Sequence, residues 1–344
     1  CNMEQEQIWE LLKRNREHAV AEDRYKKGMR YRRAGKSGLV LSELSFGLWH
    51  NFGSTDMYEN MRDMVFTAFD GGITVFDIAN NYGPAAGAAE LNFGRILKND
   101  LGGYRDEMVI TTKAGFGAWR GPYGDGGGKK YLIASLDRSL KNLGVEYVDI
   151  YYHHRPDPDT PLEETCGAFR RIIDSGKALY IGISNYSGAR MREMLSMLRE
   201  MKVPVVLNQV QYSIFERGAE EDVFGDCRKS GVGVTVYSPL AQGLLTDKYL
   251  KGIPEDSRMH KNAFLKESAL TQEKLSAIRA LNEIAQKRGQ SLAQMALSWV
   301  LRREEVSSVI IGASKREQIM DNLTLNCEFT AEELAEIDRV SKIQ

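Results

Sequence analysis

The chain has 344 residues and a formal net charge of −1, with 46 basic and 47 acidic residues. This balance gives no reason to expect nucleic acid or an anionic membrane surface as a partner. No apolar run reaches the roughly 18 residues that a membrane-spanning helix needs, so we expect no such helix.

The cysteines are far apart and match no metal-binding spacing. They are Cys1, Cys166, Cys227 and Cys327. Free thiols of this kind are typical of proteins in a reducing cytosol, so we expect a cytoplasmic protein that holds no metal.

Residues 1–28 are predicted to be an N-terminal extension. They are mostly charged and polar, and Ile8, Leu11 and Leu12 recur at helical spacing, which predicts a partly helical segment. The apolar stretch of a signal peptide is missing from them. Two explanations of Cys1 stay open, namely the residue left by lipoprotein processing and the position where the numbering begins.

Residues 29–344 are expected to form one domain in which strands and helices alternate. A β-hairpin is predicted first, from strands at 31–33 and 39–41 around a glycine-containing turn. Strand-like apolar runs follow at 45–49, 73–76, 108–112, 148–152, 178–183, 205–207, 232–237 and 308–311. Amphipathic segments predict helices at 61–69, 131–143, 161–175, 189–201, 218–229, 271–288 and 291–302.

This alternation favours an α/β fold, a (β/α)8 TIM barrel, over an open doubly wound sheet. The long gap between the runs at 232–237 and 308–311 predicts an insertion after strand 7. Insertions of this length commonly act as lids or binding loops. A further helix is expected at the C-terminus.

Residues 72–83 carry chemistry at the end of a strand. The apolar strand ends at Asp77, and Tyr82 follows five residues later. Taken alone, Asp77 is equally well explained as a turn residue that binds backbone amides, and Tyr82 as a surface residue. In a barrel, however, the carboxyl ends of all strands meet at one face, where active sites lie. The other strand ends carry Trp49, Lys113, His154, Ser184, Asn185, Gln209, Tyr237 and Ser238, so we expect an active site.

These residue types suit the reduction of a carbonyl group. A tyrosine hydroxyl can give a proton to the carbonyl oxygen while a hydride reaches the carbon. We expect the ammonium of Lys113 to lower the pKa of Tyr82, and Asp77 to keep Lys113 charged and oriented. The imidazole of His154 would polarise the substrate oxygen.

The sequence resembles the aldo-keto reductase superfamily over about residues 29–340. The resemblance is carried by residues 72–83, by Val-Ile-Thr-Thr-Lys at 109–113, by the run 148–157 and by Ile-Ile-Gly-Ala-Ser-Lys at 310–315. It implies an NADPH-dependent barrel reductase whose catalytic tetrad is Asp77, Tyr82, Lys113 and His154. Of the two adjacent histidines, His154 takes the family role because it precedes the Arg-Pro pair, and His153 is expected to be structural.

Two groups within the superfamily share longer segments, at 47–53, 79–84, 239–245 and 252–260. They are the bacterial L-glyceraldehyde 3-phosphate reductases and the β subunits of voltage-gated potassium channels. The first group implies a small aldehyde substrate such as L-glyceraldehyde 3-phosphate or methylglyoxal. The second implies an alternative, an NADPH-binding redox-sensing partner subunit, but it carries Asn in place of His154. Both imply a homo-oligomer, a tetramer or octamer.

The resemblance also implies the cofactor contacts. The nicotinamide end would contact Trp49, Ser184, Asn185, Gln209 and Tyr237. The pyrophosphate would lie under Ser238, Leu240, Gln242, Lys248 and Arg258, and the adenosine 2′-phosphate beside Gly312, Ser314, Lys315, Gln318 and Asn322. Lys315 and Arg258 would favour NADP over NAD.

The substrate pocket is expected to be lined by Trp49, Tyr82, Trp119 and His154. Nearby cations for a phosphate or carboxylate are Arg120, Lys129, Lys130 and Arg155. Residues 124–130 are glycine-rich but lack the first glycine and the final Ser or Thr of a phosphate-binding P-loop, so we interpret them as a substrate-side loop.

Overall fold

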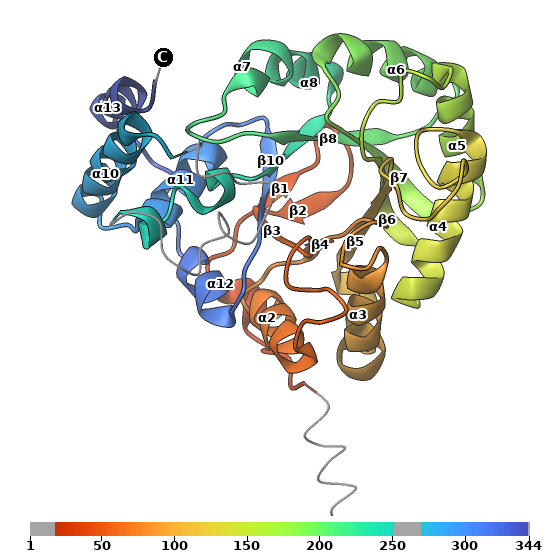
Figure 1. The fold of residues 1–344 in the computed structure, drawn as a ribbon, viewed down its shortest axis with the longest axis horizontal. Helices are drawn as coiled ribbons and strands as arrows, with labels where there is room; N and C mark the ends of the chain where they lie inside the picture. The colour runs from red at the N-terminus through yellow and green to blue at the C-terminus, as the bar shows by residue number, and fades with distance from the viewer. Residues whose placement is uncertain (1–17, 251–269, 343–344) are drawn as a thin grey trace, which may run out of the picture.

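The computed structural model describes residues 18–250 and 270–342. Eight parallel strands close into a barrel in the order β10-β3-β4-β5-β6-β7-β8-β9. These strands are β3 (Leu44–Gly47), β4 (Val75–Asp77), β5 (Val109–Ala114), β6 (Val148–His153), β7 (Ala178–Ser184), β8 (Val205–Gln211), β9 (Gly233–Tyr237) and β10 (Val306–Ile311). The predicted (β/α)8 barrel is confirmed, and Figure 1 shows the helices arranged around it.

The helices follow the strands along the chain. They are α2 (Tyr58–Asp70), α3 (Ala88–Ile96), α4 (Lys129–Leu143), α5 (Leu162–Asp174), α6 (Gly188–Glu200), α7 (Gly218–Asp222), α8 (Phe224–Ser230), α10 (Gln272–Lys287), α11 (Leu292–Leu301), α12 (Arg316–Asn322) and α13 (Ala331–Ser341). Short helical turns lie at Arg24–Lys26, Leu97–Leu101, Gly102–Glu107, Ala241–Gly243 and Asp247–Tyr249. The expected C-terminal helix is α13, which packs against α10 at one side of the barrel (Figure 1).

The predicted N-terminal hairpin is present as β1 (Tyr31–Arg33) and β2 (Val40–Ser42). Its buried Ala34 and Leu41 belong to one apolar cluster with residues at the start of barrel strands, such as Val75 of β4 and Val109 of β5. The hairpin therefore closes the amino-terminal end of the barrel. The cavity described below lies at the opposite end of the barrel, where the strands have their carboxyl ends.

Several elements differ from the sequence expectations. The strand predicted at 205–207 runs on to Gln211 as β8. The strand predicted at 73–76 begins at Val75, because the N–H groups of Gly72 and Ile73 bond to the last turn of α2 instead. The helix predicted at 218–229 is broken at Val223 into α7 and α8. The helix α3 was not among the predicted elements.

The predicted insertion after strand 7 runs from β9 to β10, and its residues 251–269 lie outside the described part. Residues 1–17 of the predicted N-terminal extension do so as well, and its boundary at residue 28 stays a prediction. The described end of that extension is held against α2, where His18 stacks on Phe66 at 3.9 Å between ring centroids and bonds Asp70 at 2.8 Å. No helix in the described residues is both long and apolar enough to cross a membrane.

Candidate active site

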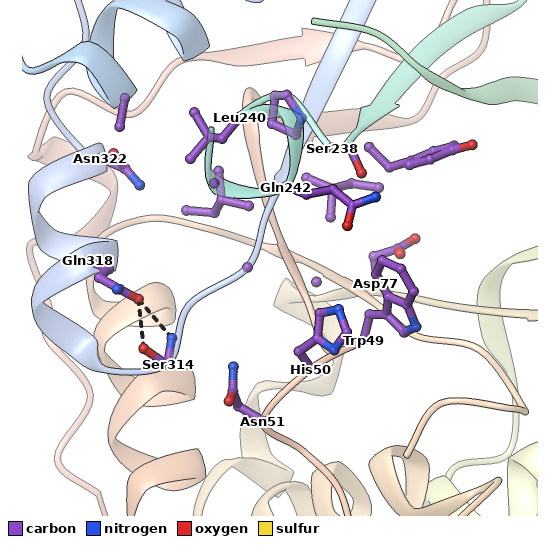
Figure 2. A pocket seen from close by; sticks show the side chains of 18 of the residues that line it. Trp49, His50, Asn51, Asp77, Ser238, Leu240, Gln242, Ser314, Gln318 and Asn322 are labelled. Carbon is purple, nitrogen blue, oxygen red and sulfur yellow. Dashed lines mark hydrogen bonds between the residues drawn. The ribbon is translucent and has the colours of Figure 1, made fainter. Parts of the chain in front are cut away.

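A cavity of about 900 Å³ opens at the carboxyl ends of the strands. It is lined by residues from most of these strand ends and from the segments that follow β9 and β10. Figure 2 shows Ser238, Leu240 and Gln242 on one side of it and Asn51 and Ser314 on the other. Every expected strand-end residue named above lines this cavity, apart from Lys113, which is fully buried behind it.

The centre of the site is a buried ion pair. Lys113 on β5 donates from Nζ to Asp77 Oδ2 at 2.7 Å, and also to the carbonyl oxygen of Ile78 at 2.7 Å. Asp77 accepts two more hydrogen bonds on Oδ1, from Thr111 and from Gln209, each at 3.0 Å. These three hydrogen bonds hold the Asp77 carboxylate, which lies on β4, to side chains of β5 and β8.

The segment that follows β4 places Tyr82 beside the Asp77–Lys113 pair. After the strand ends, Ile78 and Asn80 still donate backbone N–H groups to Thr111 and Lys113 of β5. The chain then turns, and the Tyr82 hydroxyl lies 3.4 Å from Lys113 Nζ. The turn is anchored to α4, since Asn80 Nδ2 donates to the Tyr131 hydroxyl at 3.0 Å.

His154 stands opposite, just beyond the end of β6. Its ring meets the Tyr82 ring edge-on at 5.9 Å between centroids and the Phe116 ring at 4.7 Å. Its Nδ1 atom is buried and has no hydrogen-bond partner among the described residues. The neighbouring His153 points elsewhere and bonds the Tyr186 hydroxyl at 2.6 Å, which agrees with the structural role expected for it.

Burial dominates the electrostatics of these groups. It raises the pKa of Tyr82 well above its ordinary value, and the charge of Asp77 adds to the shift. The expected lowering of this pKa by Lys113 is therefore wrong, because the pKa of Tyr82 is raised. Burial also lowers the pKa of Lys113, although Asp77 opposes that shift, and burial with the Lys113 charge lowers the pKa of His154 well below its usual range. Tyr82 is consequently a neutral hydroxyl and His154 a neutral imidazole at pH 7.

The residues expected at the nicotinamide end are interlocked. Ser184 donates to the Gln209 carbonyl at 3.0 Å, while Asn185 donates to the His154 carbonyl at 3.1 Å and accepts from the Tyr237 hydroxyl at 2.7 Å. Trp49 lies at the mouth, 36% exposed, with its ring 6.4 Å from that of Tyr82. Hydrogen-bond donors and acceptors of Ser184, Asn185 and Tyr237 are therefore gathered in the same cavity as Asp77, whose carboxylate is paired with Lys113.

The other expected cofactor residues lie further along the cavity. Its walls include Ser238, Leu240, Gln242, Lys248, Gly312, Ser314, Gln318 and Asn322. Lys315 is not among the lining residues and forms the N-cap of α12, whereas Arg258 lies outside the described residues. Asn51, Asn185, Ser238 and Gln242 have positive φ values of 67°, 59°, 52° and 59°. Such backbone strain commonly gathers where a ligand is held.

One expectation about the substrate side is wrong, and some lining residues were not expected. Trp119 does not line the cavity, because its ring packs on Tyr131 at 5.1 Å and is covered by Arg138. Asn51 and Phe116 do line it, although the sequence alone gave no reason to select them. Within 18–250 and 270–342, no cluster of three or more His, Cys, Asp or Glu side chains is arranged to hold a metal ion.

Comparison with known proteins agrees with this geometry. Residues 43–342 match the Aldo/keto reductase family, and the chain belongs to this family. It is therefore an oxidoreductase. Among its relatives is the L-glyceraldehyde 3-phosphate reductase of Escherichia coli O157:H7, 53% identical over 318 residues that cover 90% of this chain and 92% of the relative.

Two other relatives are more distant. A probable voltage-gated potassium channel subunit beta from Oryza sativa subsp. japonica is 39% identical over 302 residues, covering 86% of this chain and 90% of that one. The solved holo form of aldo-keto reductase AKR11C1 from Bacillus halodurans has a TM-score of 0.73 and 28% sequence identity, covering 91% of this chain and 97% of the other.

Proposed function

We propose that this enzyme reduces small aldehydes or ketones to alcohols with NADPH, and that Tyr82 is the proton donor. The observation that carries the proposal is the Tyr82 hydroxyl, which lines the cavity at 3.4 Å from Lys113 Nζ and faces the neutral His154. A carbonyl oxygen placed between Tyr82 and His154 would meet one proton donor and one hydrogen-bond donor.

The cavity suits a dinucleotide. Ser184, Asn185 and Gln209 offer both donors and acceptors, which the carboxamide of a nicotinamide requires. The further residues proposed to hold the cofactor are Trp49, Tyr237, Ser238, Leu240, Gln242, Lys248, Arg258, Gly312, Ser314, Lys315, Gln318 and Asn322. When bound, NADPH supplies the hydride for the carbonyl carbon.

Each residue of the tetrad then has one task. His154, neutral because burial lowers its pKa, holds the carbonyl oxygen by a hydrogen bond. Tyr82, neutral because burial raises its pKa, keeps its proton until the oxygen becomes alkoxide-like. An alkoxide is a far stronger base than a phenolate, so the proton passes from Tyr82 to it. Lys113, held by Asp77, stabilises the phenolate left behind.

The substrate proposed first is a three-carbon aldehyde, L-glyceraldehyde 3-phosphate or methylglyoxal. The 53% identity to a protein named L-glyceraldehyde 3-phosphate reductase supports this choice. The test is NADPH oxidation at 340 nm with a panel of aldehydes and ketones, with NADH in parallel. We expect multiple turnovers with a small aldehyde and a preference for NADPH; no turnover with any member of the panel would contradict the proposal.

A second candidate is an NADPH-binding redox-sensing subunit, and the 39% identity to the rice channel subunit homologue favours it. Such a protein would bind NADPH tightly but reduce the panel only slowly. His154 argues for the enzyme, because an imidazole can polarise a carbonyl oxygen.

We also propose a cytoplasmic location and a homo-oligomer, either a tetramer or an octamer. Analytical ultracentrifugation tests the assembly, since a monomer at micromolar concentration would contradict it.

A further inference from the structure

The segment between β3 and α2, residues 48–57, is bonded both to the segment after β4 and to the segment after β10, and we call it the β3–α2 loop. Asn51 in this loop donates from Nδ2 to the carbonyl oxygen of Ala313 at 2.9 Å. Asn60, in the first turn of α2, donates from Nδ2 to the carbonyl oxygen of Ser314 at 2.9 Å. Two consecutive carbonyl groups of the segment between β10 and α12 are therefore held by side-chain amides.

These two bonds fix the direction of backbone donors. Because a peptide unit is planar, the Ala313 carbonyl and the Ser314 N–H lie in one plane and point in opposite directions. Holding the carbonyl with Asn51 consequently orients that N–H. Asn51 has a φ of 67°, in the left-handed region that asparagine tolerates better than most residues, so its conformation suits this contact.

The oriented N–H of Ser314 and the hydroxyl of the same residue meet a single oxygen. The Ser314 N–H and the Ser314 hydroxyl both donate to Gln318 Oε1, at 2.8 Å and 3.3 Å, as the dashed lines in Figure 2 show. Ser314 and Gln318 both line the cavity. Gln318 Oε1 therefore occupies a position from which an oxygen of a bound anionic group could displace it. That oxygen would accept the same two hydrogen bonds from Ser314.

The other side of the β3–α2 loop is bonded to the segment that carries Tyr82. The backbone N–H and the hydroxyl of Ser54 donate to the Pro84 carbonyl at 2.6 Å and 3.0 Å. A Cβ on Gly53 would lie 2.7 Å from the same oxygen, so only glycine allows this approach. The loop thus bridges the segment after β4 and the segment after β10.

We propose that Asn51 and Asn60 are positioning residues for an anionic group at the adenosine end of the cofactor, and so set the preference for NADPH over NADH. Asn51 orients the Ser314 N–H through the Ala313 carbonyl, and Asn60 orients the Lys315 N–H through the Ser314 carbonyl. This inference rests on the proposed function, in which Ser314 and Gln318 contact the 2′-phosphate. Neither asparagine needs to touch the reacting atoms.

The test compares Asn51→Gly and Asn60→Ala with Asn92→Ala. Glycine at position 51 accepts the positive φ, so this variant removes the amide without adding strain. Asn92 is the matched control, because it holds the same loop through hydrogen bonds to other carbonyls, those of Phe52 and Gly53 at 2.9 Å and 3.1 Å. The dissociation constants of NADPH and NADH are measured by quenching of protein fluorescence.

We expect each test variant to raise the Kd of NADPH by about three- to tenfold, the range for one lost hydrogen bond, and the Kd of NADH by less than about twofold. The KM for NADPH should rise more than kcat falls, and Asn92→Ala should keep the wild-type ratio of the two Kd values. Unchanged NADPH binding in both variants, or equal losses for the two dinucleotides, would overturn the inference.

Failure of the proposed function is recognised separately. If the wild-type protein binds no NADPH, the proposed function fails, and the cofactor part of this inference fails with it. Whether Asn51 orients the Ser314 N–H can still be tested by amide hydrogen exchange in the protein without cofactor. Exchange at Ser314 should be faster in Asn51→Gly than in wild type or Asn92→Ala, and equal exchange rates would overturn that step.

Discussion

The two ends of the cavity are built from different parts of the fold. At the reacting end, Asp77 and Lys113 lie on neighbouring barrel strands, and both are buried. Their bond belongs to a network that includes Thr111 and Gln209. Since the barrel closes only in one register, these groups are fixed by the same contacts that stabilise the fold.

The adenosine end depends on segments outside the strands. Ser314 lies between β10 and α12, and its position depends on amide groups of Asn51 and Asn60, more than 250 residues away in the sequence. These are single hydrogen bonds at a partly exposed site. Changes at the reacting end should therefore cost stability together with activity, whereas changes at the adenosine end should cost affinity alone.

The largest effect is expected for Lys113→Met, which leaves the Asp77 carboxylate buried without its cation. We expect the free energy of unfolding to fall by about 3–5 kcal/mol, measured by urea denaturation. The double variant Asp77→Asn with Lys113→Met replaces both charges and should recover most of that loss. A loss below about 1 kcal/mol in the single variant would show that the reacting end is not part of the stable core.

The stability of the protein should also depend on pH through the buried His153, which lies on β6 at the reacting end. Burial lowers the pKa of His153 to about 4, against an unfolded value of about 6.5. The unfolded chain therefore takes up the proton first, so the stability from neutral His153 is complete above pH 6.5 and is lost as the pH falls toward 4. The loss attributable to this residue is roughly 3 kcal/mol.

His153→Gln is the variant for this measurement, with urea denaturation at several pH values. His154 titrates in both proteins, so the difference between their pH profiles isolates His153. Parallel profiles between pH 7 and 4.5 would contradict the assignment of His153 as a buried neutral residue.

The smallest effect is expected at the adenosine end for Lys315→Met. Removing this exposed cation should raise the Kd of NADPH by about three- to tenfold and leave that of NADH nearly unchanged, because only NADPH carries the 2′-phosphate. Stability should change by less than about 0.5 kcal/mol. Fluorescence titration and thermal unfolding check both parts, and an unaltered NADPH Kd would remove Lys315 from the proposed cofactor site.

Much of the barrel could be predicted because its signal is local. Apolar runs and amphipathic segments define strands and helices, and the strand ends then bring Asp77, Lys113 and Gln209 together. The predicted start of β4 at Ile73 is wrong because a hydrogen bond that the sequence does not reveal sets this boundary. The Ile73 N–H donates to Ala68 in the last turn of α2, and β4 begins at Val75.

The charge states and the adenosine end could not be derived from the chain in the same way. The pKa of Tyr82 depends on the depth of burial, which no spacing of residues reveals, and burial raises it. The contacts of Asn51 and Asn60 join residues far apart in sequence, and an asparagine in a loop has no distinguishing pattern. Lys315 and Gln318 were selected only by resemblance to a family.

The most direct test of the central claim is the turnover of Tyr82→Phe. The variant lacks only the hydroxyl, so the ring still fills its place beside Trp49 and His154. NADPH oxidation is measured with the best aldehyde of the panel, and NADPH binding is measured by fluorescence. We predict a kcat lower by about 10²–10⁴-fold with an unchanged NADPH Kd. Wild-type turnover in the variant would contradict Tyr82 as the proton donor.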